Sequence, residues 1–112
     1  MNLVILQGNI GQDPELRTVG QSSVLSFSIA TSEKYKDRDG ELVEKTQWHN
    51  ISMWGKEKLA PYLRKGQKVL VRGQIEYREY TTDDGTKKRA TDIKCFELEF
   101  CDKPQRSDDE AM

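Results

Sequence analysis

Hydrophobic and polar residues alternate along much of this chain with a period of two, which is the pattern of a half-buried β-strand. Residues 15–19 are expected to pair only briefly. In the last substantial strand, Phe96, Leu98 and Phe100 share one face and Ile93 is out of phase with them. Five substantial strands are predicted from this alternation and from shorter apolar runs: 2–7, 23–32, 46–54, 68–80 and 91–101.

Two Asp-Gly pairs indicate tight turns between these strands. Asp39-Gly40 lies within the polar stretch 33–45, and Asp84-Gly85 follows the fourth strand. Asp-Gly between alternating strands is a strong hairpin signal, because the turn needs positive φ angles that glycine adopts easily. We therefore expect two hairpins, and the second leads into a basic triplet.

One short helix is expected between the third and fourth strands. In residues 56–65, Leu59, Tyr62 and Leu63 are three or four positions apart and form one apolar face. Pro61 fits the first turn of such a helix. Five strands with this one helix are the layout of an all-β OB-fold, a five-stranded Greek-key barrel whose ligands lie across its second and third strands and nearby loops.

The strand at 46–54 has an unusual face. Alternation places Trp48 and Trp54 on one side together with Asn50 and Ser52, whereas His49 and its apolar neighbours point to the other side. Two indoles among small polar groups indicate a solvent-exposed surface with flat aromatic rings. Nucleobases stack on such rings whatever their sequence. The alternative is that each tryptophan only covers an edge of the barrel.

Two tyrosines and several basic residues extend this candidate surface. Tyr35 lies in a polar loop among lysines, and Tyr80 lies beside Arg78 at the root of the second hairpin, where it could instead pack across the strands. Each basic residue could also be an ordinary solvated charge. The candidate phosphate contacts are Lys56, Arg72, Arg78, Lys87, Lys88 and Arg89.

Length and charge set further bounds. At 112 residues the chain is expected to form one domain, residues 1–103, followed by a short acidic tail, 104–112, that we expect to be disordered. The formal net charge is −1, but three acidic residues lie in the tail, so the rest carries a slight positive excess. This is a weak global signal, and phosphate binding would depend on local clusters.

The sequence offers no sign of catalysis, cofactors or metals. Cys95 and Cys101 are about 20 Å apart if they share one strand, at the usual rise per residue, so we interpret both as reduced structural thiols. The single His49 lacks a partner acid or nucleophile, and no metal-ligand spacing is present. No apolar run is long enough for a membrane helix and no signal peptide is visible, so a cytoplasmic location is expected.

Six short motifs follow one another along residues 1–103. These motifs are Gly8-Asn9-Ile10-Gly11-Gln12-Asp13-Pro14-Glu15, Ala30-Thr31-Ser32-Glu33, Thr46-Gln47-Trp48-His49, Trp54-Gly55-Lys56, Tyr62-Leu63-Arg64-Lys65-Gly66 and Val71-Arg72-Gly73-Gln74-Ile75. In their order and spacing the chain resembles the bacterial single-stranded DNA-binding protein family, including its phage members, over about residues 1–103.

The resemblance implies roles for particular residues. Aromatic side chains at the positions of Tyr35, Trp48, Trp54 and Tyr80 stack on bases in this family, and His49 falls near subunit contacts. It also implies a homo-oligomer, with a tetramer favoured and a dimer possible. The usual long linker and terminal phenylalanine that recruit replication and repair proteins are missing here, so recruitment through the tail is not supported.

These observations predict a non-enzymatic protein that coats single-stranded DNA in replication, recombination and repair, in a bacterial or phage-infected cell and associated with the nucleoid. Stacking on four aromatic residues and a basic path for the backbone would supply the binding. One alternative is an OB-fold that binds RNA or acts as a primosomal factor. Another is an OB-fold module for protein interaction that has lost nucleic-acid binding.

Overall fold

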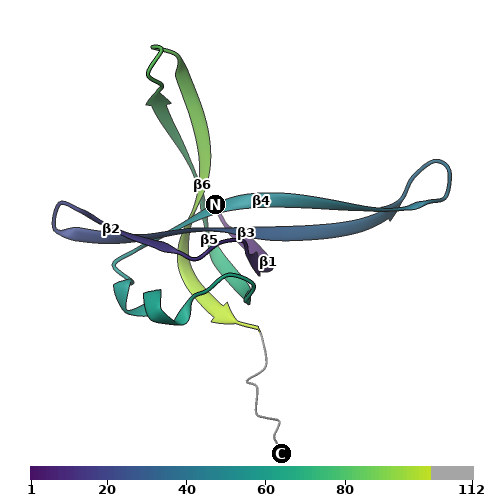
Figure 1. Cartoon of the computed structure of the whole chain (residues 1–112), viewed down its shortest axis with the longest axis horizontal. Helices are drawn as coiled ribbons and strands as arrows, with labels where there is room; N and C mark the ends of the chain where they lie inside the picture. Colours follow the sequence, from purple (N-terminus) through teal and green to yellow (C-terminus); the bar gives the residue numbers. More distant parts are fainter. Residues whose placement is uncertain (102–112) are drawn as a thin grey trace, which may run out of the picture.

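The computed structural model describes residues 1–101, which form six β-strands and one short 3-10 helix (Figure 1). The predicted helix between the third and fourth substantial strands is present, and the brief strand expected at 15–19 is the second strand of the structure. The predicted acidic tail lies outside the described residues. The elements are β1 (Val4–Ile10), β2 (Glu15–Val19), β3 (Ser22–Lys36), β4 (Leu42–Trp54), η1 (Glu57–Tyr62), β5 (Lys68–Thr81) and β6 (Lys87–Phe100).

The strands form a closed barrel. Their order in the sheet is β1-β5-β6-β4-β3-β2, and β1 pairs a second time with β3 through Asn9 and Ile10. That second pairing closes a ring of β1, β5, β6, β4 and β3, while β2 lies outside the ring on β3. The β4–β6 pairing is parallel and the other pairings are antiparallel. The predicted five-stranded barrel is therefore confirmed.

The barrel interior is filled from alternate positions of each strand, as the period-two pattern predicted. On the β3–β4 ladder Leu25 pairs with Met53 and Phe27 with Ile51, and all four side chains are buried. Burying a side chain of this size is worth about 1.5–3 kcal/mol each, which makes this alternation the main determinant of register. The core consists of Ile10, Leu25, Phe27, Ile29, Ile51, Met53, Leu63, Val69, Val71, Ile93 and Cys95.

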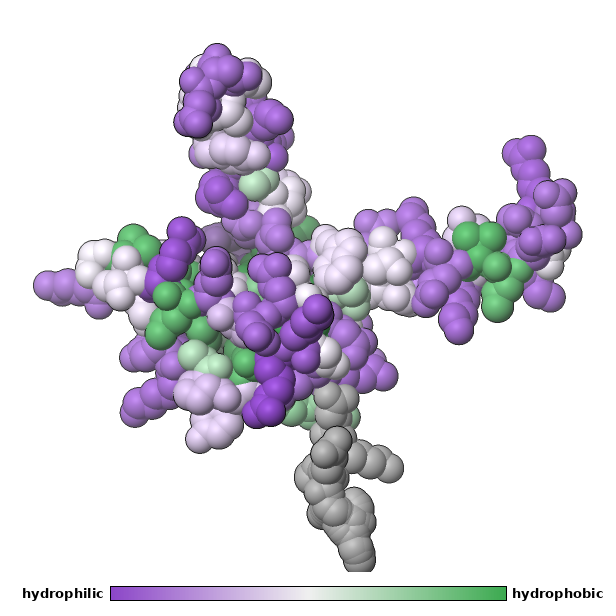
Figure 2. Space-filling view, in the orientation of Figure 1, coloured by the Kyte–Doolittle hydropathy of each residue, from purple (hydrophilic) through white to green (hydrophobic). Residues whose placement is uncertain are grey.

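Two hairpins extend beyond the barrel as long arms. The β3–β4 ladder continues to Lys36 opposite Leu42, and the β5–β6 ladder continues to Thr81 opposite Lys87. The arms leave the barrel in different directions (Figure 1), and their surfaces are mostly hydrophilic (Figure 2). We call them the β3–β4 arm (residues 31–47) and the β5–β6 arm (residues 76–92).

Both arms end in the turns that the Asp-Gly pairs predicted. Gly40 and Gly85 have φ angles of 80° and 85°, in the left-handed region that favours glycine. In the first turn, the Asp37 carboxylate accepts the backbone N–H groups of Asp39 and Glu41, both at 2.9 Å. In the second, Asp84 accepts the Thr86 N–H at 3.0 Å, and together with a hydrogen bond from the Thr82 hydroxyl this lowers its pKa.

The helix differs from its prediction. Pro61 is the fifth of its six residues instead of lying in the first turn, and the segment forms a 3-10 helix. Tyr62 was predicted on the apolar face but is 63% exposed. Leu63 does enter the core, but only after the helix has ended and the backbone has become extended. A proline lacks the N–H that a longer helix needs, so the segment stays short and turns back toward the barrel.

The last strand contains an irregularity that the sequence pattern did not reveal. Arg72 pairs with Glu97 but Gly73 pairs with Cys95, so Phe96 has no partner on β5. This bulge shifts the alternation by one residue, which is why Ile93 is out of phase with Leu98 although both face the core. The prediction that Phe96 shares a face with Leu98 was wrong, because Phe96 is the bulged residue and is largely exposed.

Candidate nucleic-acid interface

The two tryptophans lie on the outer face of the barrel. The register pairs Trp48 with Ala30 and Trp54 with Val24, and the positions between them pair serines with Asn50 and Ser52. All these side chains point away from the core, as the alternation predicted. Trp48 and Trp54 are six residues apart, which corresponds to about 20 Å along the strand. They therefore form two separate platforms joined by a floor of small polar groups.

Trp48 is seated on a glycine. Its side chain is 62% exposed, and the aromatic ring passes so close to Gly11 that a Cβ atom there would collide with ring atoms Cζ3 and Cη2. The Gly11 N–H donates to the Ser28 carbonyl at 2.9 Å, which holds the glycine on β3 beside the ring. Gly11 therefore sets the position of the exposed indole, although the sequence alone indicated only a turn or a close approach.

Trp54 borders an open groove with a volume of about 570 Å³. Its side chain is 42% exposed, so part of the ring is accessible to a ligand. The floor of the groove is the polar face of the β3–β4 ladder, one wall comes from β2, and the other wall comes from β5 and β6. Residues that line it include Glu15, Arg17, Ser26, Ser28, Asn50, Ser52, Trp54, Glu76, Arg78 and Asp92.

The groove holds charges of both signs. The Arg78 Nε atom donates to the Asp92 carboxylate at 2.8 Å, and this hydrogen bond raises the pKa of the Arg78 guanidinium above its ordinary value. Glu15 and Glu76 also line the groove. The predicted phosphate contact Arg78 thus lies where we expected it, but it is already engaged by an acidic neighbour that sequence reasoning missed.

The β5–β6 arm carries different residues on its two faces. Pairing of Arg78 with Ala90 and of Tyr80 with Lys88 places those four side chains on the groove side, which we call the front face of the arm. The Arg78 guanidinium lies 5.7 Å from the centre of the Tyr80 ring. Lys88 therefore lies directly across the ladder from Tyr80.

The basic triplet is divided between these faces. Lys87 pairs with Thr81 and Arg89 pairs with Glu79, which places both basic side chains on the opposite, back face of the arm. Successive residues of a strand alternate sides, so three consecutive basic residues cannot form one surface here. Tyr77 also lies on the back face, opposite Thr91.

Tyr35 and Lys56 lie beyond the two ends of the β4 segment that carries the tryptophans, residues 48–54. Tyr35 pairs with Val43 in the β3–β4 arm, five positions beyond Ala30, so alternation places it on the other side of the ribbon from Trp48. Lys56 is exposed in the turn directly after Trp54. This turn is held by Gly55, which donates to the Ser23 carbonyl at 2.9 Å, and by the Ser23 hydroxyl, which donates to Glu57 and lowers its pKa.

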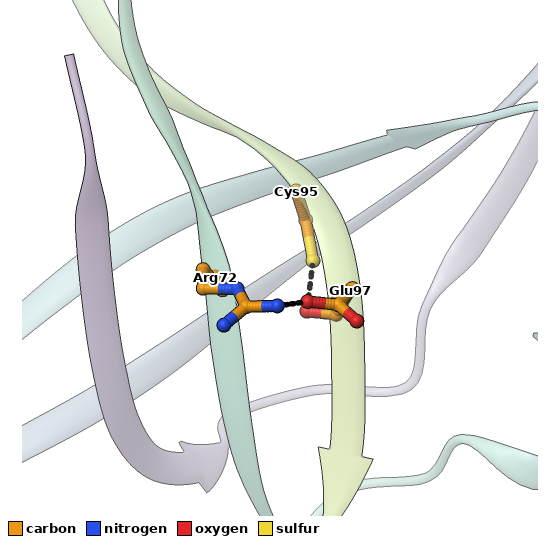
Figure 3. A network of polar contacts seen from close by, with 3 residues as sticks. All are labelled: Arg72, Cys95 and Glu97. Atoms are coloured by element: carbon orange, nitrogen blue, oxygen red, sulfur yellow. Dashed lines mark hydrogen bonds and ion pairs between the residues drawn. The ribbon is translucent and has the colours of Figure 1, made fainter. Parts of the chain in front are cut away.

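Arg72 is remote from the groove. It lies on β5 between Ile5 of β1 and Glu97 of β6, and it forms an ion pair with the Glu97 carboxylate (Figure 3). In the same cluster the Cys95 thiol donates to the Glu97 carbonyl at 3.1 Å. The structure does not bring Arg72 together with the other predicted phosphate contacts.

His49 lies on the side of β4 opposite the tryptophans. It pairs with Ile29, is half-buried, and its Nε2 atom lies 2.9 Å from the Thr31 hydroxyl. This geometry gives His49 a hydrogen-bonded place on the inner side of β4. Whether it also touches another subunit stays a prediction.

Tyr77 lies on the same side of β5 as Val69, Val71 and Ile75, but it is 64% exposed. By that position β5 has left the barrel, so its inner face has no core to enter. The sequence position of the Asp84-Gly85 turn could have shown that Tyr77 is exposed, because Tyr77 is close enough to this turn to lie within the arm.

The comparison with known proteins now decides the family. The model of the single-strand binding protein family matches residues 1–101. This chain belongs to that family.

Relatives in the family are close in sequence. A single-stranded DNA-binding protein of Neisseria meningitidis is 44% identical over 103 residues, which cover 89% of this chain and 59% of the relative. Single-stranded DNA-binding protein 1 of Chlorobaculum tepidum is 42% identical over 104 residues, 89% of this chain and 64% of the relative. The chain thus spans about three fifths of the length of the curated relatives it matches.

Solved structures confirm the fold. The Plasmodium falciparum SSB in complex with ssDNA superposes with a TM-score of 0.83 at 34% identity, covering 91% of this chain and 96% of that one. The Thermus aquaticus single-stranded DNA binding protein superposes with a TM-score of 0.79 at 27% identity, covering 96% of this chain and 52% of that one. The OB-fold prediction is therefore confirmed at the level of a family structure.

Other site types find no support in the part of the chain that is described. Within residues 1–101, no three His, Cys, Asp or Glu side chains gather in a way that could hold a metal ion. Within the same residues, none of the helical segments has the length and apolar character needed to cross a membrane.

Proposed function

We propose that this protein binds single-stranded DNA with little sequence preference and protects it during replication, recombination and repair. The observation that carries the proposal is the outer face of β4, where two accessible indoles flank a polar floor and an open groove. Membership of the single-strand binding protein family supports the same ligand. The role is binding and not catalysis.

Binding depends on stacking of bases and on contacts to the backbone. Trp48 and Trp54 offer ring faces to bases, with Tyr80 and Tyr35 as further platforms on the two arms, and stacking contributes about 1–3 kcal/mol per base. Phosphates are met by Lys56, Arg78 and Lys88 near the groove, with Lys87, Arg89 and Arg72 as more distant contacts. Duplex DNA binds poorly because its bases are already stacked on one another.

We also propose that the protein works as a homo-oligomer, with a tetramer favoured. Support comes from β1, whose residues 4–8 pair with β5 on one edge and have no strand pairing on the other edge within the described chain. Leu3 and Ile5 are exposed beside this open edge. An unpaired edge flanked by exposed apolar side chains favours pairing with a second copy. His49 is the proposed contact on another face.

Tryptophan fluorescence tests the DNA proposal directly, because Trp48 and Trp54 are the two tryptophans of the chain. Titration with oligo-dT is expected to quench the emission strongly, whereas duplex DNA of the same length quenches weakly. Trp48→Phe and Trp54→Phe each leave one reporter, so each platform can be followed separately. No quenching at low salt would reject the proposal, and stronger binding of oligo-U than of oligo-dT would indicate an RNA ligand.

Alanine variants give the strength of each platform. Trp54→Ala and Trp48→Ala are each expected to weaken oligo-dT binding by about 5- to 100-fold, in line with about 1–3 kcal/mol per stacked base. Tyr62→Ala is the matched control, because Tyr62 is an equally exposed aromatic residue on η1 that does not line the groove. Equal loss in the control variant would show that the effect is not specific to the groove.

A further inference from the structure

The back face of the β5–β6 arm exposes an aromatic ring that the proposed interface does not use. Tyr77 is 64% exposed, more than Trp48, Trp54 or Tyr80. Its direct partner across the ladder is Thr91, a small residue that cannot cover the ring. The Tyr77 ring is therefore accessible to a ligand from solvent, as Tyr62 also is, so its neighbours decide whether it forms a site.

A basic residue lies over this ring. The Arg89 guanidinium carbon is 5.1 Å from the centre of the Tyr77 ring, a distance typical of a cation–π contact. Arg89 can cover one ring face, and the ring remains largely accessible. Next to it a shallow hollow of about 240 Å³ is lined by Glu79, Lys87, Lys88 and Arg89. Of these residues Glu79, Lys87 and Arg89 have their side chains on the back face, and two of those three are basic, so the hollow favours an anionic ligand.

The front face of the same arm has the same combination. There Arg78 lies 5.7 Å from the centre of the Tyr80 ring. Each face of the arm therefore presents one tyrosine with an arginine against it, and the two pairs are separated by the thickness of a two-stranded ribbon. Aromatic rings interleaved with basic side chains are what non-specific single-strand binding requires.

We infer that Tyr77 and Arg89 form a second stacking site for a nucleobase of single-stranded DNA, on the back face of the β5–β6 arm. Tyr77 stacks on the base, and Arg89 and Lys87 contact the adjoining phosphates. One continuous strand reaches both faces by crossing an edge of the arm. The tip is unsuited to this crossing because Asp83 and Asp84 lie there. This inference rests on the proposed single-strand binding.

The first test is the dependence of affinity on oligonucleotide length. Tyr77→Leu is expected to leave binding of short oligo-dT unchanged, because short strands occupy the groove near Trp54. For strands long enough to cross the arm, it is expected to weaken binding by about 5-fold or more, the lower end of base–aromatic stacking. Tyr77→Phe keeps the aromatic ring and is expected to bind long oligo-dT with the affinity of the wild-type protein.

A charge variant gives an independent measurement. Arg89→Gln is expected to reduce the slope of log affinity against log salt by about 0.7 for long oligo-dT, the value for one phosphate contact on a single strand. The slope for short oligo-dT is expected to stay the same. Tyr62→Leu is the matched control for loss of an exposed tyrosine. Melting curves confirm that each variant is folded.

Photocrosslinking locates the strand. Oligonucleotides that carry 5-iododeoxyuridine are irradiated with the protein, and the adducts are mapped by mass spectrometry. Adducts on Tyr77 with long strands support the second site. Adducts restricted to Trp48, Trp54 or Tyr80, together with unchanged affinity of Tyr77→Leu, overturn the second site and leave the proposed function intact. Absence of both adducts and quenching rejects the proposed function itself.

Discussion

At the scale of single residues, the interface depends on side chains that the fold holds in unusual surroundings. Trp48 is exposed yet packs closely on Gly11, which leaves space for the indole ring because it has no side chain. Arg78 lies in the groove but is held by Asp92. Cys95 is a thiol enclosed by the core. In each case residues that are distant in the sequence decide how the side chain behaves.

Substitution of Gly11 by alanine should disturb Trp48 selectively. Gly11 lacks the positive φ angle that would strain an alanine, so the cost is steric contact of the new methyl group with the indole. An extra methyl group in a packed position costs about 1–3 kcal/mol, and we expect the low end because the ring lies at the surface and can move.

The measurement uses Gly11→Ala in the Trp54→Phe background, where Trp48 is the sole reporter. The emission of Trp48 should shift, and oligo-dT should bind several-fold more weakly, in a range bounded by about 1–3 kcal/mol for one stacked base. Gly40→Ala is the control for general destabilisation, because Gly40 lies at the tip of the β3–β4 arm with open space around it and does not contact Trp48. Unchanged emission and affinity in Gly11→Ala would contradict this role.

The stability of the protein should depend on pH through Cys95. Burial raises the pKa of the Cys95 thiol from 9.0 to about 11. A group whose pKa is higher in the folded state favours folding while it is protonated. Its contribution is thus complete below about pH 9 and is lost as the pH rises toward 11.

Denaturant unfolding at pH 8, 9, 10 and 11 measures this contribution. The free energy of unfolding of the original protein should fall more steeply between pH 9 and 11 than that of Cys95→Val, which lacks the titrating group. In the native protein a thiol reagent at pH 8 should label the more accessible Cys101 before the buried Cys95. Parallel pH profiles of the two proteins would show that Cys95 is not responsible.

At the scale of elements, the proposed binding surface is divided between the groove and the two arms. The β3–β4 ladder provides the floor and both indoles, β2 provides one wall, and the β5–β6 arm provides the other wall. The cross-strand pair of Arg78 on β5 and Asp92 on β6 lies in that wall. It holds the arginine in place but cancels part of the positive charge that phosphates would meet.

Removal of the Asp92 charge should therefore strengthen binding. Asp92→Asn frees Arg78 for phosphate and removes a repulsive carboxylate, so the affinity for oligo-dT should rise at low salt. The slope of log affinity against log salt should become steeper by up to about 0.7, corresponding to one additional phosphate contact on a single strand. Weaker binding with a shallower slope would contradict the prediction.

Glu97→Gln is the matched comparison, because it frees Arg72 in the same way outside the groove. We expect a smaller gain in affinity from this variant than from Asp92→Asn. A larger gain would place Arg72 closer to the path of the strand than Arg78.

At the scale of the whole molecule, the barrel serves as a rigid base from which both arms project (Figure 1). The net charge of −1 does not attract DNA by itself. The proposed binding relies on local stacking and on basic side chains of the arms, so salt should weaken it moderately. The exposed apolar residues beside the open edge of β1 give the molecule a second type of surface, suited to another copy of itself.

Light scattering should show a mass that is a multiple of the 12.9 kDa chain. Ile5→Glu places a charge beside the open edge of β1 and is expected to lower the assembly state while short oligo-dT still binds. His49→Ala tests the other proposed contact in the same assay. Tyr62→Glu is a control charge at an exposed aromatic position away from β1. A monomeric original protein at micromolar concentration would contradict the homo-oligomer.

The interface was predictable from the sequence where local patterns decide the outcome. Trp48 and Trp54 share a face because strand side chains alternate, and this holds wherever the strand lies. Gly40 and Gly85 form turns because glycine adopts positive φ angles. The apolar phase of β3 and β4 determines which side enters the core, so the outer face follows from it. These features depend on neighbours within a few residues.

Other features depended on the tertiary structure, because they involve contacts between distant segments. The pairing of β5 with β6 decides that Tyr77 is outside the core and that Lys87 and Arg89 lie on the back face of the arm. Closure of the barrel brings Gly11 under Trp48, and the bulge at Phe96 reverses the phase of β6. The alternation of side chains along a strand determines which residues share a side. Whether that side faces the core, the groove or solvent is determined only by how the strands pair in three dimensions.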